Sequence, residues 1–424
     1  MPRLQHSQNR LMSCLNACAA NPCVQYTIMT VRWFPVVFIC GVMCWGYYAY
    51  VIQLCLFTVP YWWERLIYLI PGHFLLALFM WSYFMCIFAP IGKPSKKFYL
   101  PDDVLTELDE SQTPSQHRSI LERYIRQNNL PIMMRGFDGS VRYCEKCQCL
   151  KPDRCHHCSI CGHCVLKFDH HCPWVNTCVN FNNYKFFVQF LGFALILCAF
   201  AALTDLKYFI WFWETGLRTS DGGKFHILFL FFASGMFAIS VSTLFFYHLW
   251  LTSRNRSTIE SFRAPMFTYG PDKDGFNLGI RRNFREIFGR SRLQWVLPVF
   301  SSEGDGNSYP IRLSASDLEM AHADFIARQQ QARLMQQQAA AAAPPPGADP
   351  GAAPETALTM THVSNSENYE NGLPSGFEPE SDGLLSCRYK LIEQGSSDSE
   401  DNIPLPSSLD QNGTTQSTAP IVAL

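Results

Sequence analysis

Cysteine and histidine residues recur in an interleaved pattern between Cys144 and Cys178, and this pattern constrains the fold more than any other feature of the chain. The motif Cys-x2-Cys-x9-His-x6-Cys occurs there in two copies. The first copy consists of Cys144, Cys147, His157 and Cys164, and the second copy of Cys158, Cys161, His171 and Cys178. Three thiolates and one imidazole are a typical ligand set for structural zinc, which prefers tetrahedral geometry. The repeat therefore predicts a small module folded around two structural zinc ions.

Cys172 also lies in this region but has no place in the ligand pattern. A third copy of the motif would start there, but its partner position holds Val175 instead of a cysteine. Asp169 and His170 lie just before it, and neither belongs to a ligand set. A thiolate is the nucleophilic form of cysteine, an imidazole can accept its proton, and a carboxylate can orient the imidazole. We therefore interpret Cys172 as a catalytic nucleophile, with His170 as its base and Asp169 as the orienting carboxylate.

Two other interpretations of the module are open at this point. If Cys172 is a further zinc ligand or a buried apolar residue, the protein is a membrane-anchored zinc adaptor without catalytic activity. A thiol-disulfide carrier would need a resolving cysteine, but the unassigned Cys149 and Cys155 form no Cys-x2-Cys pair with Cys172. Neither alternative gives Asp169 and His170 a role beside the thiol.

Long apolar runs determine the fold class outside the module. They cover about residues 31–56, 66–88, 186–206 and 225–251, and about 20 apolar residues suffice to cross a bilayer as a helix. The formal net charge of −1 argues against a dedicated nucleic-acid binder, so we expect no nucleic-acid partner. The sequence predicts an all-α membrane protein with four transmembrane helices, a small cysteine-rich zinc module and a disordered C-terminal tail.

Basic residues near the membrane ends predict the orientation. Arg32 precedes the first span, Lys96 and Lys97 follow the second, and Arg254 follows the fourth, and cytosolic segments are rich in lysine and arginine. Both termini and the zinc module should therefore be cytosolic, where thiols stay reduced and bind metal. The predicted divisions are an N-terminal segment (1–30), transmembrane helices (31–92), a connector (93–141), the zinc module (142–185), transmembrane helices (186–252), a C-terminal domain packed on the zinc module (253–312) and a largely disordered tail (313–424).

The segment Asp169-His170-His171-Cys172 resembles the signature of the DHHC family of protein S-acyltransferases. Residues 142–147 and 172–176 also match the cysteine-rich domain of that family, and the resemblance extends over about residues 32–312. The chain is most similar to the branch without ankyrin repeats. The resemblance implies a protein S-palmitoyltransferase in which Cys172 takes the acyl group of a long-chain acyl-CoA such as palmitoyl-CoA. The acyl group then passes to cytosolic cysteines of membrane-associated proteins, while both zinc ions are structural.

The resemblance also implies supporting residues. In the motif Ser257-Thr258-Ile259-Glu260, Thr258 would hydrogen-bond near the catalytic aspartate, and Asn283 would hold the C-terminal segment against the active-site domain. The CoA phosphates would contact Lys151, Arg154 and His156, and the acyl chain would pass Trp174 and Phe187 and end near Gly46 and Leu197. The modest size of these last two residues predicts tolerance of long acyl chains. Golgi, plasma membrane and endosomal membranes all fit the sequence.

Overall fold

The computed structural model describes residues 21–215, 223–313 and 315–342 of the 424-residue chain. Residues 1–20 of the predicted N-terminal segment and the part of the predicted tail (313–424) beyond residue 342 lie outside the described residues, whereas the helix α11 (Ala315–Ala342) falls within the first part of that tail. Within the described part the fold is mostly helical, as the sequence predicts, and its strands are only two or three residues long.

Four helical segments of the described chain are long and apolar enough to cross a membrane. They are α2 (Pro22–Tyr47) continued by the π-helix η1 (Tyr48–Thr58), α3 (Trp62–Phe88), α6 (Tyr184–Thr215) and α7 (Gly223–Arg254). The four predicted apolar runs are confirmed, although each helix extends beyond its run. The first helix starts nine residues before its run, where Pro22 occupies the first helical turn and the Asn21 side chain accepts a hydrogen bond from the Cys23 amide.

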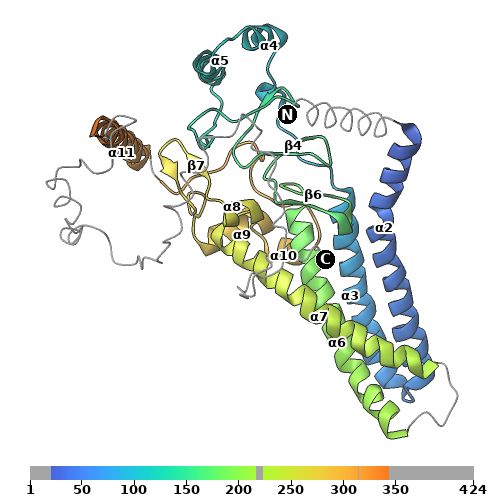
Figure 1. The fold of residues 1–424 in the computed structure, drawn as a ribbon. Helices are drawn as coiled ribbons and strands as arrows, with labels where there is room; N and C mark the ends of the chain where they lie inside the picture. Colours follow the sequence, from blue (N-terminus) through green and yellow to red (C-terminus); the bar gives the residue numbers. More distant parts are fainter. Residues whose placement is uncertain (1–20, 216–222, 314, 343–424) are drawn as a thin grey trace, which may run out of the picture. The chain divides into compact units, whose positions relative to one another are not determined.

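Helices α3, α6 and α7 pack side by side, whereas α2 contacts η1 and the turn η3 (Pro173–Val175) of the zinc module (Figure 1). A glycine permits the close approach of α6 and α7, because a β-carbon at Gly192 would come within 3.0 Å of the Phe245 ring. The apolar surfaces of α2 and of the outer faces of the other helices are left exposed, including Phe57, Leu203 and Ile239. Such surfaces are suited to a lipid environment.

The zinc module is built from three antiparallel hairpins of similar backbone. They are β1 (Tyr143–Cys144) with β2 (Cys149–Leu150), β3 (His156–Cys158) with β4 (His163–Val165), and β5 (His170–Cys172) with β6 (Thr177–Val179). The turns contain Gln148, Gly162 and Asn176, each with a positive φ and each fourteen residues from the next. The repeat in the sequence is therefore also a repeat of the backbone, and it includes a third hairpin that has no complete ligand set.

The connector forms η2 (Lys96–Phe98) and two short helices, α4 (Asp102–Asp109) and α5 (Pro114–Gln127). Its buried side chains, which include Phe98, Leu121 and Ile125, form one cluster with Leu150 of β2. In this cluster the connector thus packs on the first hairpin of the zinc module and not on the third hairpin, which carries Cys172.

The segment after α7 contains short elements. They are α8 (Thr258–Phe262), β7 (Met266–Phe267), β8 (Gly270–Pro271), α9 (Ile280–Phe288), α10 (Arg292–Val296) and the longer helix α11 (Ala315–Ala342).

Candidate active site and metal centres

The structure assembles both predicted ligand sets. The side chains of Cys144, Cys147, His157 and Cys164 form one group, those of Cys158, Cys161, His171 and Cys178 form the other, and the potential ligand atoms within each group lie within 4.8 Å of one another. In both groups the histidine lies directly across a hairpin from the last cysteine. This donor set and spacing suit a tetrahedral zinc ion, so the residues present fit the metal that the sequence predicts.

Asp169, His170 and Cys172 come together at the third hairpin. His170 and Cys172 lie on β5, and the Nδ1 atom of His170 is 2.7 Å from Oδ2 of Asp169. Asp169 and Cys172 are almost fully buried, with 1% and 3% exposure, whereas the His170 side chain is 31% exposed. The carboxylate therefore binds one ring nitrogen and leaves the other available for proton transfer.

Thr258 supplies two further hydrogen bonds to Asp169. Its backbone amide donates to Oδ1 over 2.9 Å, and its hydroxyl donates to Oδ2 over 2.7 Å. A capping box between Ser257 and Glu260 starts helix α8 at this point and fixes the direction of the Thr258 amide. The Ser257 side chain thus acts as the N-cap of α8 and accepts a hydrogen bond from the Glu260 amide.

The charges of this pair are mutually stabilised. Burial alone would raise the pKa of Asp169, but hydrogen bonds from His170 and Thr258 stabilise the carboxylate and hold that pKa well below its ordinary value. Burial lowers the pKa of His170, but hydrogen bonds with Asp169 and Cys172 outweigh burial and raise it to about 10. At neutral pH the imidazole is therefore protonated, and a neighbouring imidazolium favours the thiolate form of a cysteine.

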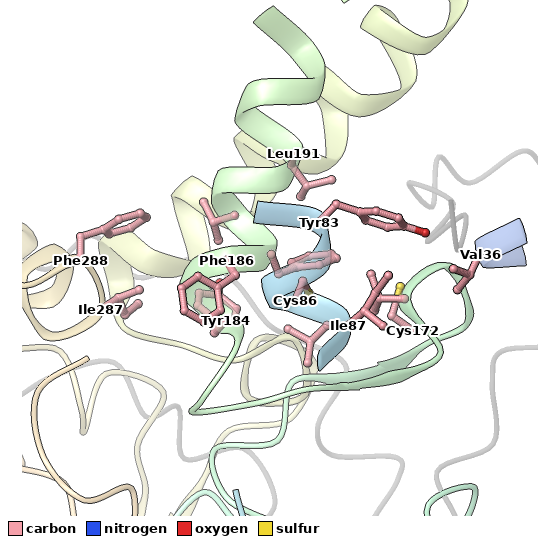
Figure 2. Close-up of a cluster of buried hydrophobic side chains, with 14 residues drawn as sticks. Val36, Tyr83, Cys86, Ile87, Cys172, Tyr184, Phe186, Leu191, Ile287 and Phe288 are labelled. Carbon is pink, nitrogen blue, oxygen red and sulfur yellow. The ribbon is translucent and has the colours of Figure 1, made fainter. Parts of the chain in front are cut away.

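Cys172 lies at the boundary between the zinc module and the membrane helices. Figure 2 shows its sulfur among apolar side chains that include Val36 of α2 and Ile87 of α3. The Tyr83 hydroxyl of α3 donates to the Trp174 carbonyl over 3.0 Å and so ties the turn after Cys172 to a membrane helix. The Cys172 sulfur, which the sequence predicts to be the nucleophile, therefore lies among side chains of two membrane helices.

The residues predicted to meet the acyl chain are distributed along α2, η3 and α6. The Trp174 ring packs against Phe38 of α2, with ring centroids 6.4 Å apart, and Phe187 is 2% exposed and meets the His170 ring edge-on. Leu197 is partly buried in α6, and a β-carbon on Gly46 would meet no atom within 4 Å. There is open space beside Gly46, as an acyl-chain end would require.

The residues predicted to meet the CoA phosphates are largely buried. Arg154 is 1% exposed, forms a 2.7 Å ion pair with Glu260 and donates two hydrogen bonds to Asn255. A phosphate would have to displace Glu260 to reach it. Lys151 is 2% exposed, and burial together with nearby cations lowers the pKa of His156 well below its ordinary value, so that this imidazole is neutral.

Asn283 is completely buried in α9 and makes three hydrogen bonds. Its Nδ2 donates to the Ser253 carbonyl at the end of α7 and to the Asn277 side chain, and its Oδ1 accepts from the Leu278 amide. It therefore links the C-terminal segment to the helix that leads to Thr258.

Sequence reasoning missed two groups of residues near the site. Glu260 and Asn255 hold Arg154; Glu260 belongs to the motif that the sequence singled out, but its pairing with Arg154 was not predicted. His248 of α7 lies beside His170 and contacts Tyr184 of α6, but nothing in their apolar surroundings distinguishes these two residues in the sequence. Their partners become evident only when the helices are packed.

Comparisons with known proteins agree with this geometry. Residues 138–264 match a family model described as DHHC palmitoyltransferase. The chain is 50% identical over 289 residues to palmitoyltransferase ZDHHC2 of Homo sapiens, covering 68% of this chain and 78% of that protein. It is 51% identical over 294 residues to palmitoyltransferase ZDHHC20 of Homo sapiens, covering 69% and 80%, respectively. It is 48% identical over 282 residues to palmitoyltransferase ZDHHC15 of Xenopus laevis, covering 66% and 82%.

Proposed function

The chain belongs to the DHHC palmitoyltransferase family, and we propose that it transfers a long-chain acyl group from acyl-CoA to protein cysteines through a thioester on Cys172. The observation that carries this proposal is the hydrogen-bonded Asp169–His170 pair beside a cysteine that neither predicted zinc set uses. Protein S-palmitoyltransferase activity follows from the family, and the roles of the individual residues are our inference.

In the first step, the Cys172 thiolate attacks the carbonyl carbon of the acyl-CoA thioester. A bond forms between Sγ and this carbon, the bond to the CoA sulfur breaks, and the CoA thiolate takes the proton held by His170. Asp169 keeps the Nδ1 side of the ring occupied, so that the proton is exchanged at Nε2. The products are a thioester on Cys172 and free CoA thiol.

In the second step, a substrate cysteine takes the place of CoA. Neutral His170 accepts the proton of the substrate thiol, the resulting thiolate attacks the Cys172 thioester, and the Cys172 thiolate leaves. The imidazolium and thiolate of the starting state are restored without any further reactant. One acid-base pair therefore serves both halves of the cycle.

Zinc would be held by the two Cys3His sets and would supply folding energy, without taking part in bond making. His171 and Cys178 of the second set flank the catalytic residues on the paired strands β5 and β6. Their ligation would fix the hairpin that carries Cys172. The active site would accordingly depend on metal for its shape.

The donor would be a long-chain acyl-CoA, with its chain among the membrane helices and its head group on the cytosolic side. Open space beside Gly46 supports acceptance of palmitate or somewhat longer chains. Burial of Lys151 and the Arg154–Glu260 ion pair restrict their direct access to CoA phosphates. We therefore propose that Arg154 chiefly stabilises the fold. His156, as a neutral imidazole, would contribute to the packing of the module and not to the attraction of CoA phosphates.

Membrane-associated proteins with cysteines near the cytosolic membrane surface would be the acceptors. Cys172 lies just before α6 enters the membrane, so its reach is limited to thiols near that surface. The cytosolic placement of the termini and of the zinc module rests on the distribution of lysine and arginine. Golgi, plasma membrane and endosomal membranes are all compatible with this placement.

Release of CoA from palmitoyl-CoA tests the proposed function in purified protein. We expect a burst of CoA thiol equal to about one per active molecule, followed by slow CoA release limited by hydrolysis of the acyl-enzyme; a cysteine peptide anchored in the micelle should accelerate this release by accepting the acyl group. A zinc adaptor would release no CoA above the rate of empty micelles, and that result would contradict the proposal.

A further inference from the structure

A second buried histidine lies directly behind His170. His248 is part of α7, six residues before its end at Arg254, and is 1% exposed. Its ring centroid is 6.0 Å from that of His170 and 5.1 Å from that of Phe187. The proposed chemistry needs only one histidine, so the position of a second one requires its own explanation.

His248 is itself held in place by α6. The Tyr184 hydroxyl lies 3.2 Å from Nδ1 of His248, and the two ring centroids are 5.7 Å apart. Phe187, one turn further along α6, meets both histidine rings nearly edge-on, at interplanar angles of 72° and 78°. The three rings of His248, Phe187 and Tyr184 therefore form a continuous packed wall beside His170.

His170 needs such a wall because its own anchoring is incomplete. Its hydrogen bonds with Asp169 and Cys172 hold the ring only at its edge, and 31% of the side chain is exposed. Without support on its faces, the ring could shift and carry Nε2 away from the Cys172 sulfur. Misplacement of a catalytic group by about 1 Å can slow a reaction by about a hundredfold.

The helix that carries His248 also leads to Thr258. Helix α7 ends at Arg254, and the chain then starts α8 with Thr258, which donates two hydrogen bonds to Asp169. One continuous segment thus contacts the imidazole through His248 and the carboxylate through Thr258. Both members of the acid-base pair would be oriented by the same structural unit.

We infer that His248, locked by Tyr184 and packed with Phe187, is a positioning residue that holds the His170 imidazole in line with Cys172. The inference rests on the proposed function and deepens it, because it names a residue that acts on the reaction without touching a reactant. Its role is to fix the orientation of the His170 ring, and it takes no part in proton transfer.

The test measures single-turnover acylation of Cys172 by palmitoyl-CoA in the full-length protein in detergent, with the rate expressed per zinc-loaded molecule. We expect His248→Ala to lower this rate by about tenfold to a hundredfold while the KM for palmitoyl-CoA changes less than about twofold. His248→Phe retains a ring against Phe187 and His170, so it should recover the rate to within about threefold. An unchanged rate in His248→Ala would overturn the inference.

A double-mutant cycle separates positioning from general stability. If His248 acts through His170, adding His248→Ala to His170→Ala should cause less than about a twofold further loss. A purely structural role would instead reduce the rate by the same factor in both backgrounds, and that outcome would also overturn the inference.

His226 provides a matched control on the same helix. It lies near the other end of α7, and its Nδ1 accepts a hydrogen bond from the Trp45 indole over 3.3 Å. His226→Ala should leave the acylation rate per zinc-loaded molecule within about twofold of wild type. If wild-type protein forms no adduct at Cys172, the proposed function fails, whereas a normal wild-type adduct with an unaltered His248→Ala rate removes this inference alone.

Discussion

The second and third hairpins of the zinc module have the same backbone but different chemistry. His156, His157 and Cys158 on β3 occupy the same places as His170, His171 and Cys172 on β5. In both hairpins the middle histidine is a zinc-set member that pairs across the hairpin with another, Cys164 or Cys178. The third hairpin keeps this framework, yet Cys172, which ends β5, is not part of a ligand set.

Two substitutions account for the difference. The turn after Cys158 contains Cys161, which completes a metal-binding pair, whereas the turn after Cys172 contains the fully buried Val175. The position before His156 is Cys155, whereas the position before His170 is Asp169. Removing one thiol leaves a cysteine uncoordinated, and adding one carboxylate gives the adjacent histidine a charged partner. The same hairpin framework that would bind metal thus carries the proposed nucleophile.

The largest expected contrast is between Cys158→Ser and Cys172→Ser. The first variant should lose about one zinc per molecule and most of its folded yield, because metal binding contributes folding energy. The second should retain both zinc ions and its thermal unfolding temperature. Zinc content by elemental analysis and size-exclusion behaviour in detergent measure both effects. Equal zinc loss in the two variants would place Cys172 among the ligands.

The corresponding histidines should differ almost as strongly. His170→Ala should lower the single-turnover acylation rate by about 10² to 10⁴, the range typical of a lost acid-base group. His156→Ala should change it by less than about threefold, because a neutral imidazole next to Cys155 has no carboxylate partner. Comparable losses of rate in both variants would mean that a histidine at this hairpin position supports the fold of the module, and would contradict an acid-base role specific to His170.

Replacing Asp169 should make the third hairpin resemble the second. Asp169→Asn should slow acylation by about 10²-fold, because the imidazolium loses its counter-charge. The stability that a raised histidine pKa contributes is complete below about pH 6.5 and is lost as the pH rises through about 10. The difference in unfolding temperature between wild type and Asp169→Asn should therefore shrink from pH 6.5 to pH 10. A difference that stays constant over this range would contradict the assignment.

Much of this contrast could be predicted from the sequence. Zinc ligands and apolar runs follow local sequence patterns. The two ligand sets, the four membrane helices and the absence of Cys172 from both ligand sets could therefore be predicted from the sequence. Partners distant in sequence are not, because nothing at Arg154 indicates Glu260 and nothing at His170 indicates His248. Arg154 was predicted to contact the CoA phosphates, but it pairs with the buried Glu260. Its charge alone does not reveal whether the guanidinium faces solvent or a buried carboxylate.

The smallest expected effect concerns the support of Asp169. Thr258→Val removes the hydroxyl hydrogen bond but keeps the backbone amide that donates to the same carboxylate. A hydrogen bond to a charged group contributes about 1.5–3 kcal/mol, and because the amide bond to Asp169 remains we expect a loss at the low end of that range, roughly a tenfold slower acylation. Thr258→Ser should retain most of the wild-type rate. The single-turnover acylation rate at pH 7 measures the effect of each variant. A wild-type rate in Thr258→Val would mean that the amide alone suffices.

The central claim is that Cys172 carries the acyl group, and acylation with a clickable palmitoyl-CoA analogue tests it most directly. Purified wild-type protein should acquire one hydroxylamine-labile label that maps to the peptide containing Cys172, and Cys172→Ser should acquire none there. No label on the wild type, or an undiminished label in Cys172→Ser, would contradict the account and favour a zinc adaptor with passively acylated cysteines elsewhere in the chain.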